Sequence, residues 1–422
     1  MKYQHRVLGM LSLLSVITYL DRVCIAVAGP RMQDALHISP QAWGWVTSVF
    51  FIAYGIFEIP SGALGDRIGP RLVLTRIVAW WSVFTSITGA VSRFPVLLLV
   101  RFCFAAGEAG AYPNASTVIA RWIPVAKRTR AWGTLWMSGQ LGAVLSPLLV
   151  VPIQVRYGWR ASFFVFGVLG VAWSVVWYVW FRDSPHDKPG VSPDELREID
   201  SAPLSHSHGM PWSTALRLPA LWRIAATAAC YTYSFGFFQA WLQTYLVKGR
   251  GFTEAALVFS SLTYAVGATA NALGGVAGDQ MVARYGLRIA RRTIGAVALA
   301  LAAAFLTAAI FAPSGKLALI FLSLAYGAIL FQQPSLCAIC LDVGGKHPGA
   351  VFAFMNTACS ATAALSAIIF GTLVGHFGNY NAPFVPMVAF LCVGALLWLQ
   401  ADPTRELFPE PIPAELATAA PA

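Results

Sequence analysis

The chain has 422 residues, of which 57% are hydrophobic and only 11% are charged. A soluble domain carries about a quarter of its residues as Asp, Glu, Lys or Arg, so this composition excludes a soluble fold. The formal net charge of +11 would suit a nucleic-acid-binding protein only if the basic residues gathered on one surface, and their distribution along the chain argues against that.

Apolar stretches of roughly 20 residues recur along the whole chain, and each is long enough to cross a bilayer. In chain order they cover residues 7–29, 42–61, 72–92, 96–120, 131–152, 161–181, 219–246, 255–277, 289–312, 317–341, 348–375 and 382–400. We therefore predict an all-α membrane protein with twelve transmembrane helices. The first stretch resembles a secretory signal, but Asp21 and Arg22 interrupt it, which indicates an uncleaved helix.

The Lys and Arg residues fall mainly on one side of this alternating pattern. Twenty of the 29 lie in segments on the same side as the N-terminus, seven lie on the other side, and Arg22 and Arg101 lie inside predicted helices. Cytoplasmic loops of membrane proteins are enriched in Lys and Arg. We therefore predict that the protein lies in the cell inner (plasma) membrane with both termini in the cytoplasm, and no nucleic-acid partner is expected.

A polar stretch rich in Pro, Ser, Asp and Glu separates the first six predicted helices from the last six. The predicted organisation is an N-terminal six-helix bundle, a cytoplasmic linker, a C-terminal six-helix bundle and a cytoplasmic tail, over residues 1–185, 186–216, 217–402 and 403–422. The seven cysteines all lie in predicted helices, so no disulfide framework is expected.

The two halves share a short repeat. Gly62-Ala-Leu-Gly-Asp66 follows the second predicted helix, and Gly275-Val-Ala-Gly-Asp279 follows the eighth. Two six-helix halves related by internal repetition, with a binding site at their interface, are one known plan of a secondary transporter. The repeat therefore favours a transporter.

Four ionisable residues lie well inside predicted helices of the first half: Asp21, Arg22, Arg101 and Glu108. A charge at the bilayer centre costs at least about 2.5–3.5 kcal/mol, so each is a candidate for function. Arg101 and Glu108 fall on one stripe of a helix, about 10 Å apart, which is too far for a direct pair. We expect both to contact partners from the first helix.

These charges suggest roles in binding and proton coupling. Arg22 is the predicted anion receptor, because a guanidinium binds a carboxylate in a two-pronged geometry that Lys cannot copy. Asp21 and Glu108 are the predicted proton sites, since burial and nearby charges control the protonation of a carboxyl group. Arg101 is expected to stabilise charged Asp21. The alternative is an ion-pair network that only holds two helices together.

Several segments resemble a known family. The run from Gly62 to Arg71, GALGDRIGPR, resembles the G-x-L-x-D-R-x-G-x-R signature of the major facilitator superfamily. Tyr19-Leu-Asp-Arg22 and the segment from Arg101 to Pro113 resemble its anion:cation symporter branch, which includes proton-coupled importers of galactonate, glucarate and hexuronates. The resemblance spans roughly residues 7 to 405. It implies two six-helix bundles around a central cavity, in a monomer.

The resemblance also implies residue roles. The loop after the second helix is expected to act as a conformational latch. Its residues are Gly62, Asp66, Arg67 and Arg71, and Asp279 after the eighth helix is expected to act with them. Predicted substrate contacts are Tyr19, Arg22, Tyr54, Gln140, Gln332, Asn356 and Ser360. Polar residues also commonly hold membrane helices together, which is the alternative interpretation for most of this set. The sequence departs from the family pattern at Glu58, where Gln is common, and at Cys359 and Ser360.

The predicted function is proton-coupled symport of a small organic anion into the cytoplasm by alternating access, with a sugar acid such as an aldonate, aldarate or hexuronate as substrate. Alternatives are symport of aromatic or dicarboxylic acids and drug:proton antiport on the same fold, although two membrane Arg residues argue against antiport. An enzyme is not expected, because no His lies in the middle of a predicted helix. No metal or cofactor is expected.

Overall fold

A computed structural model of the chain describes residues 2–199, 212–344, 348–404 and 407, without side-chain positions for residues 59, 63, 66, 125, 126, 129, 212, 214, 341 and 348–350. Across these ranges the chain forms helices and turns and contains no strand. Nine helices of the described part are long and apolar enough to cross a membrane. The prediction of an all-α membrane protein is confirmed.

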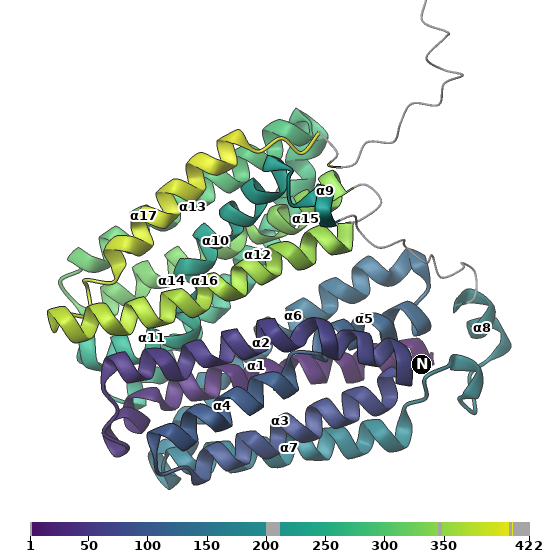
Figure 1. Cartoon of the computed structure of the whole chain (residues 1–422), viewed down its shortest axis with the longest axis horizontal. Helices are drawn as coiled ribbons and strands as arrows, with labels where there is room; N and C mark the ends of the chain where they lie inside the picture. The colour runs from purple at the N-terminus through teal and green to yellow at the C-terminus, as the bar shows by residue number, and fades with distance from the viewer. Residues whose placement is uncertain (1, 200–211, 345–347, 405–406, 408–422) are drawn as a thin grey trace, which may run out of the picture.

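The N-terminal half is built from long helices that run back and forth in chain order (Figure 1). They are α1 (Tyr3–Ala35), α2 (Pro40–Ile68), α3 (Pro70–Ala90), α4 (Phe94–Glu108), α5 (Ala111–Trp122), α6 (Val125–Tyr157) and α7 (Trp159–Trp180). A 3-10 turn (Pro185–Asp187), α8 (Pro193–Ile199) and α9 (Trp212–Ala215) follow before the second half.

The C-terminal half repeats this arrangement. Its elements are α10 (Pro219–Ala240), α11 (Leu242–Thr244), the π-helical turn η2 (Tyr245–Gly249), the 3-10 turn η3 (Ala255–Ser260), α12 (Ser261–Tyr285), α13 (Leu287–Phe311), α14 (Gly315–Phe331), α15 (Gln333–Gly344), α16 (Pro348–Phe377) and α17 (Phe384–Gln400). The predicted domain boundaries stay predictions, and of the predicted tail only residues 403, 404 and 407 are described.

The predicted segment 96–120 matches one apolar span, Phe94–Trp122, but this span is divided, because α4 ends at Glu108 and α5 starts at Ala111. A Cβ atom at Gly110 would lie 2.0 Å from the Ser61 hydroxyl oxygen, so α2 passes close to the backbone at the break. Pro113 has no N–H to donate to the carbonyl four residues earlier. The predicted helix 317–341 is likewise divided, at Gln332 between α14 and α15.

Each half packs as its own bundle. In the first half α1 packs on α6 and α3 on α7, and in the second half α12 packs on α14 and α13 on α17. At the boundary between the halves, α2 lies along α16 and α6 lies along α12 (Figure 1). The chain thus forms two six-helix bundles with α1, α2, α10 and α16 close to the boundary.

The two ends of the molecule differ in how the halves are joined. We call the end with the N-terminus and α8 the linker end, and the opposite one the far end (Figure 1). At the far end Arg31 pairs with Glu254, and the Lys248 Nζ lies 2.7 Å from Asp34 Oδ1. The Gln33 amide there donates to the Thr244 hydroxyl at 3.0 Å. Among the described residues, these polar contacts tie the halves together mainly at the far end.

Helix α8 is fixed to the N-terminal half at the linker end. The Glu195 carboxylate accepts from the Gln4 backbone N–H at 2.7 Å, and Glu195 is buried. Glu198 accepts from Lys2 Nζ at 2.7 Å and also pairs with Lys127 at the start of α6. The linker helix therefore holds the start of α1 close to the start of α6.

We expect the docking of α8 to survive mild acid. Hydrogen bonds from Lys127, Lys2 and Gln4 lower the pKa of Glu198 from 4.5 to about 2. A carboxylate whose pKa is lowered in the folded protein stabilises the fold fully above its ordinary pKa. This stabilisation is lost as the pH falls through the lowered value. Docking should therefore weaken only between about pH 4.5 and about pH 2.

Spin labels at Asp194 on α8 and Thr134 on α6 would report this docking as a distance in detergent-solubilised protein. Glu198→Gln should broaden the distance distribution already at neutral pH, because the amide has one acceptor oxygen instead of two and no charge to attract Lys2 and Lys127. A narrow, wild-type distribution in that variant would contradict the assigned contacts.

Candidate functional site

A cavity lies between the two halves, nearer the far end than the linker end. Helices α1, α2 and α4 of the first half and α10 of the second half supply its walls, with the side chains of Tyr19, Arg22, Ile25, Val46, Thr47, Phe50, Phe51, Arg101, Phe235, Gln239 and Ala240. Its walls belong to both halves, so a movement of one half against the other would change which end it faces. This cavity is the candidate substrate site.

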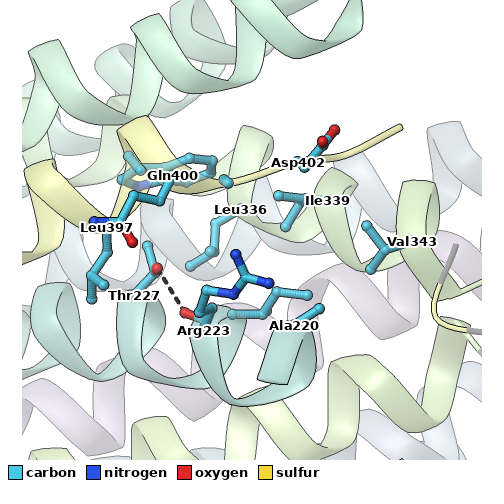
Figure 2. A pocket seen from close by; sticks show the side chains of 12 residues that line it. Ala220, Arg223, Thr227, Leu336, Ile339, Val343, Leu397, Gln400 and Asp402 are labelled. Atoms are coloured by element: carbon cyan, nitrogen blue, oxygen red, sulfur yellow. Dashed lines mark hydrogen bonds between the residues drawn. The ribbon is translucent and has the colours of Figure 1, made fainter. Parts of the chain in front are cut away.

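A second cavity lies at the linker end of the C-terminal half, among α10, α15 and α17 (Figure 2). Figure 2 shows Arg223 and Thr227 on its α10 wall, where the Thr227 hydroxyl donates to the Arg223 carbonyl at 2.8 Å. Leu336, Val343 and Asp402 lie on the other walls. All its lining residues come from one half, so a relative movement of the halves would not expose it alternately to the two ends.

Arg22 is the central cation of the cavity between the halves. Its Nε donates to the Glu108 carboxylate, and its Nη2 is buried with no hydrogen-bond partner among the described residues. The guanidinium carbon lies 4.8 Å from the Tyr54 ring centre, 5.3 Å from that of Phe50 and 5.6 Å from that of Tyr19. Aromatic faces attract a cation, so three rings and one carboxylate fix this guanidinium while one donor stays free.

Asp21 and Arg101 form the second part of the charged cluster. Both are buried, and the Trp81 and Thr85 side chains of α3 lie beside the Asp21 carboxylate. The Arg101 guanidinium lies 4.3 Å from the Phe104 ring centre and interacts electrostatically with Asp21 and Glu108. The structure thus brings all four predicted membrane charges into one cluster between α1 and α4.

The break between α4 and α5 shapes this cluster. Glu108 is the last residue of α4 and is completely buried against Arg22. Tyr112, beyond the break, turns its hydroxyl to the Ser15 hydroxyl of α1 at 2.9 Å. Arg101 and Glu108 thus each face α1, while their roles in transport stay predictions.

The structure separates the other predicted substrate contacts from the cavity. Of that set, only Tyr19 and Arg22 are among the residues that line the cavity. The Tyr54 ring lies against the Arg22 guanidinium, next to the lining. Gln140 on α6 and Gln332 at the joint of α14 and α15 are buried, and both carry amide atoms with no hydrogen-bond partner in the described ranges.

Asn356 and Ser360 lie where α16 packs on α2. The Asn356 amide nitrogen donates to both Glu58 oxygens, at 3.1 and 3.0 Å. A Cβ atom added at Gly55 would lie 3.5 Å from that of Ser360. Asn356 therefore joins the two halves on the linker side of the cavity, and a substrate role for these residues stays a prediction.

Sequence reasoning missed several residues that line the cavity. These are Thr47, Phe50, Phe51, Phe235 and Gln239. Phe50 could have been found, because it precedes Tyr54 by four residues and so shares its helix face. Nothing in the local pattern marks Gln239, whose amide nitrogen lies 3.4 Å from the Tyr326 hydroxyl.

The predicted latch residues surround the turn from α2 to α3. A Cβ atom at Gly65 would lie 1.7 Å from Asn114 Oδ1, so this glycine allows α5 to pack on α2. At the turn Gly69 adopts φ 91°, and the Arg71 N–H donates to the Asp183 carboxylate at 2.8 Å. Arg71 Nε also donates to the Tyr178 carbonyl at 2.9 Å.

The other predicted latch residues are mainly exposed or contact only their neighbouring helix. Arg67 is exposed, Asp279 is exposed on α12, and the Asp66 side chain lies outside the described ones. Gly62 packs against α5, where an added Cβ would lie 2.9 Å from Pro113 Cβ. The described contacts of Arg71 hold α3 to the end of α7 in one half, so the role of this set as a latch stays a prediction.

Comparison with known proteins gives a consistent picture. A family model described as the Major Facilitator Superfamily matches residues 11–367. The chain is 33% identical over 413 residues to a probable sulfoacetate transporter of Cupriavidus necator, covering 95% of this chain and 94% of that protein. It is 27% identical over 386 residues to the hexuronate transporter of Bacillus subtilis, covering 89% of each.

Two further comparisons extend this. A probable L-galactonate transporter of Escherichia coli is 27% identical over 400 residues, covering 91% of this chain and 86% of that protein. In structure, a bacterial homologue of the human lysosomal transporter Spinster matches with a TM-score of 0.80 at 20% identity, covering 94% of this chain and 97% of that one. That likeness shows a shared fold.

Proposed function

We propose, since this chain belongs to the Major Facilitator Superfamily, that it is a secondary active transporter of small organic anions. The substrate we propose is a sugar acid such as an aldonate, aldarate or hexuronate, carried together with protons into the cytoplasm. Proteins of this superfamily are transporters and not enzymes. The named relatives include carriers of hexuronate and galactonate, which supports an organic anion as substrate.

The observation that carries the proposal is the environment of Arg22. Its guanidinium lies in a cavity between the halves, is fixed by aromatic rings, and keeps one donor without a partner among the residues that the structure describes. A largely buried cation with a free donor attracts an anion, and a guanidinium can bind two carboxylate oxygens at once. The anionic group of the substrate would therefore bind at Arg22.

Glu108 supplies a physical route to proton coupling. Its carboxylate occupies the Arg22 Nε, so it competes with the substrate for the same guanidinium. A proton on Glu108 removes its negative charge and weakens that pair, which strengthens binding of an incoming anion. Asp21 and Arg101 form a second carboxylate–guanidinium couple beside the first. Coupling between proton and anion is reciprocal, so a proton gradient could drive uptake.

The ends of the molecule fit this direction of transport. The linker end carries the excess of Lys and Arg in the sequence, so we propose that it faces the cytoplasm, with both termini there, in a bacterial inner membrane. The far end is held closed by the pairs of Arg31 with Glu254 and of Lys248 with Asp34. We propose that in this conformation the cavity exchanges ligand with the cytoplasm. We also propose that the protein acts as a monomer.

The proposal is tested by uptake of labelled galactonate and glucarate into proteoliposomes under an imposed inward proton gradient. The wild type should accumulate label. Glu108→Gln should lose the response to the gradient by at least about tenfold, because the amide keeps the contact with Arg22 but cannot take a proton. Asp194→Asn, at an exposed linker position, serves as the matched control and should behave as the wild type.

The two outcomes separate the roles. Uptake by Glu108→Gln that still follows the proton gradient would remove Glu108 from the coupling step and leave Asp21 as the proton site. Wild-type protein that accumulates no organic anion under any gradient would contradict the proposed function.

A second candidate substrate class follows from the cavity walls. Phe50, Phe51 and Phe235 line the cavity together with Arg22. Three phenyl rings beside a guanidinium also suit an aromatic acid, whose ring would stack while its carboxylate binds Arg22. Competition of benzoate or 4-hydroxybenzoate against labelled galactonate distinguishes this class from sugar acids.

A further inference from the structure

Helix α2 presents a third membrane carboxyl group toward the charged cluster. Phe50, Tyr54 and Glu58 follow one another at intervals of four, so they share one face of α2. The rings of Phe50 and Tyr54 contact the Arg22 guanidinium. Glu58 lies one turn further toward the linker end, about 6 Å along the helix axis, and interacts electrostatically with Arg22.

Glu58 has a neutral partner only. Both its oxygens accept from the Asn356 amide nitrogen of α16, and it forms no ion pair with a described Lys or Arg. An amide supplies hydrogen bonds but no positive charge. Because α2 and α16 pack side by side across the boundary of the halves (Figure 1), the Glu58 carboxyl group stands on the linker side of the cavity.

The cationic groups belong to the neighbouring helices and stack on the rings of α2. Arg22 and Arg101 come from α1 and α4, and their unpartnered nitrogens are found there. Thr47 and Gln239 line the cavity beside these cations, and the pair of Glu58 with Asn356 lies beyond Tyr54, outside the lining and on its linker side. Hydroxyl groups can donate to these acceptors. A second carboxylate on the substrate would meet the Glu58 charge in a medium that screens it poorly.

We infer that Glu58 makes this transporter selective for anions with a single negative charge, such as an aldonate, over the corresponding dianion. This inference rests on the proposed function, and it narrows the class of sugar acids to those with one charged end and a hydroxylated other end. Gln, the common residue at this position in the related family, would keep the hydrogen bond to Asn356 without the charge.

The test uses two pairs of labelled anions that differ only by a terminal CH2OH in place of a carboxylate. They are galactonate with galactarate, and 2-hydroxyethanesulfonate with sulfoacetate. The ratio of kcat/KM for monoanion over dianion is measured in proteoliposomes for wild type, Glu58→Gln and the charge-keeping control Glu58→Asp. The wild type should prefer the monoanion of a transported pair by at least about tenfold, and Glu58→Gln should reduce that preference by about tenfold.

Each other outcome counts against the inference. A wild type without preference, or a Glu58→Gln variant that loses uptake of both members equally, would show that Glu58 only holds α2 to α16. Loss of the preference in Glu58→Asp as well would mean that side-chain length, and not charge, sets it. If the wild type takes up neither pair, the proposed sugar-acid function is contradicted. The inference about Glu58, which rests on that function, then fails as well.

Discussion

Replacing Arg22 by Lys is expected to reduce organic-anion uptake by at least about a hundredfold, although the positive charge is kept. The guanidinium uses Nε for Glu108 and keeps Nη2 for a further acceptor. A Lys ammonium is one point charge, so it cannot hold the carboxylate and the anion in this fixed geometry. A hydrogen bond to a charged group contributes about 1.5–3 kcal/mol, so losing one or two accounts for the predicted factor.

The loss of aromatic stacking adds to this effect. The Arg22 guanidinium lies over Tyr54, Phe50 and Tyr19, and a cation over an aromatic face contributes about 0.5–2 kcal/mol. Uptake of labelled galactonate and binding to purified protein should fall together, since both depend on the anion contact. Arg130→Lys, at an exposed position on α6, is the matched control. Arg22→Lys with near-normal binding would show that the anion binds elsewhere.

Reversing the charge at Arg31 is expected to reduce uptake by at least about tenfold, and exchanging the charges of both partners should restore it. Arg31 joins α1 to Glu254 of the other half and donates to the Gln154 carbonyl of α6. Arg31→Glu would place two carboxylates together, so the far end would no longer close. A transporter that alternates must form and break this contact in every cycle, and either failure stops transport.

Accessibility measures the same change directly. A cysteine at Thr47 in the cavity, in a background without the native cysteines, should react with an impermeant maleimide from the far end in Arg31→Glu and much less in the parent. The variant that combines Arg31→Glu with Glu254→Arg should recover both protection and uptake. Unchanged labelling and uptake in Arg31→Glu would mean that the pair of Lys248 and Asp34 keeps the far end closed by itself.

The local pattern of the sequence explains most of the fold. Stretches of roughly 20 apolar residues must form helices in a bilayer, because every backbone N–H and C=O needs a partner inside its own segment. Predicted and observed helices agree in place, apart from the breaks at Gly110, Trp241 and Gln332. Those breaks depend on neighbours, since the Ser61 hydroxyl of α2 would touch any side chain at Gly110.

The membrane charges were also apparent from the sequence by itself, because Asp21, Arg22, Arg101 and Glu108 interrupt apolar helices where a charge is costly. Which of them meet was decided by the tertiary structure. Pairing of Arg22 with Glu108, and of Glu58 with Asn356 across 298 residues of chain, depends on the rotation and depth of whole helices. A pattern along one helix records its own faces but not its neighbour.

The same limit applies to the far end. In the sequence Arg31 is only one of the few basic residues on the less basic side, and Glu254 is an ordinary loop residue. Folding brings them together and makes them a contact between the halves. Local hydrophobicity and charge thus determined where the apolar helices lie and which charged residues lie inside them. The packing of one half against the other decided which contacts join the halves at the far end and which side chains line the cavity, because those contacts join residues far apart in the chain.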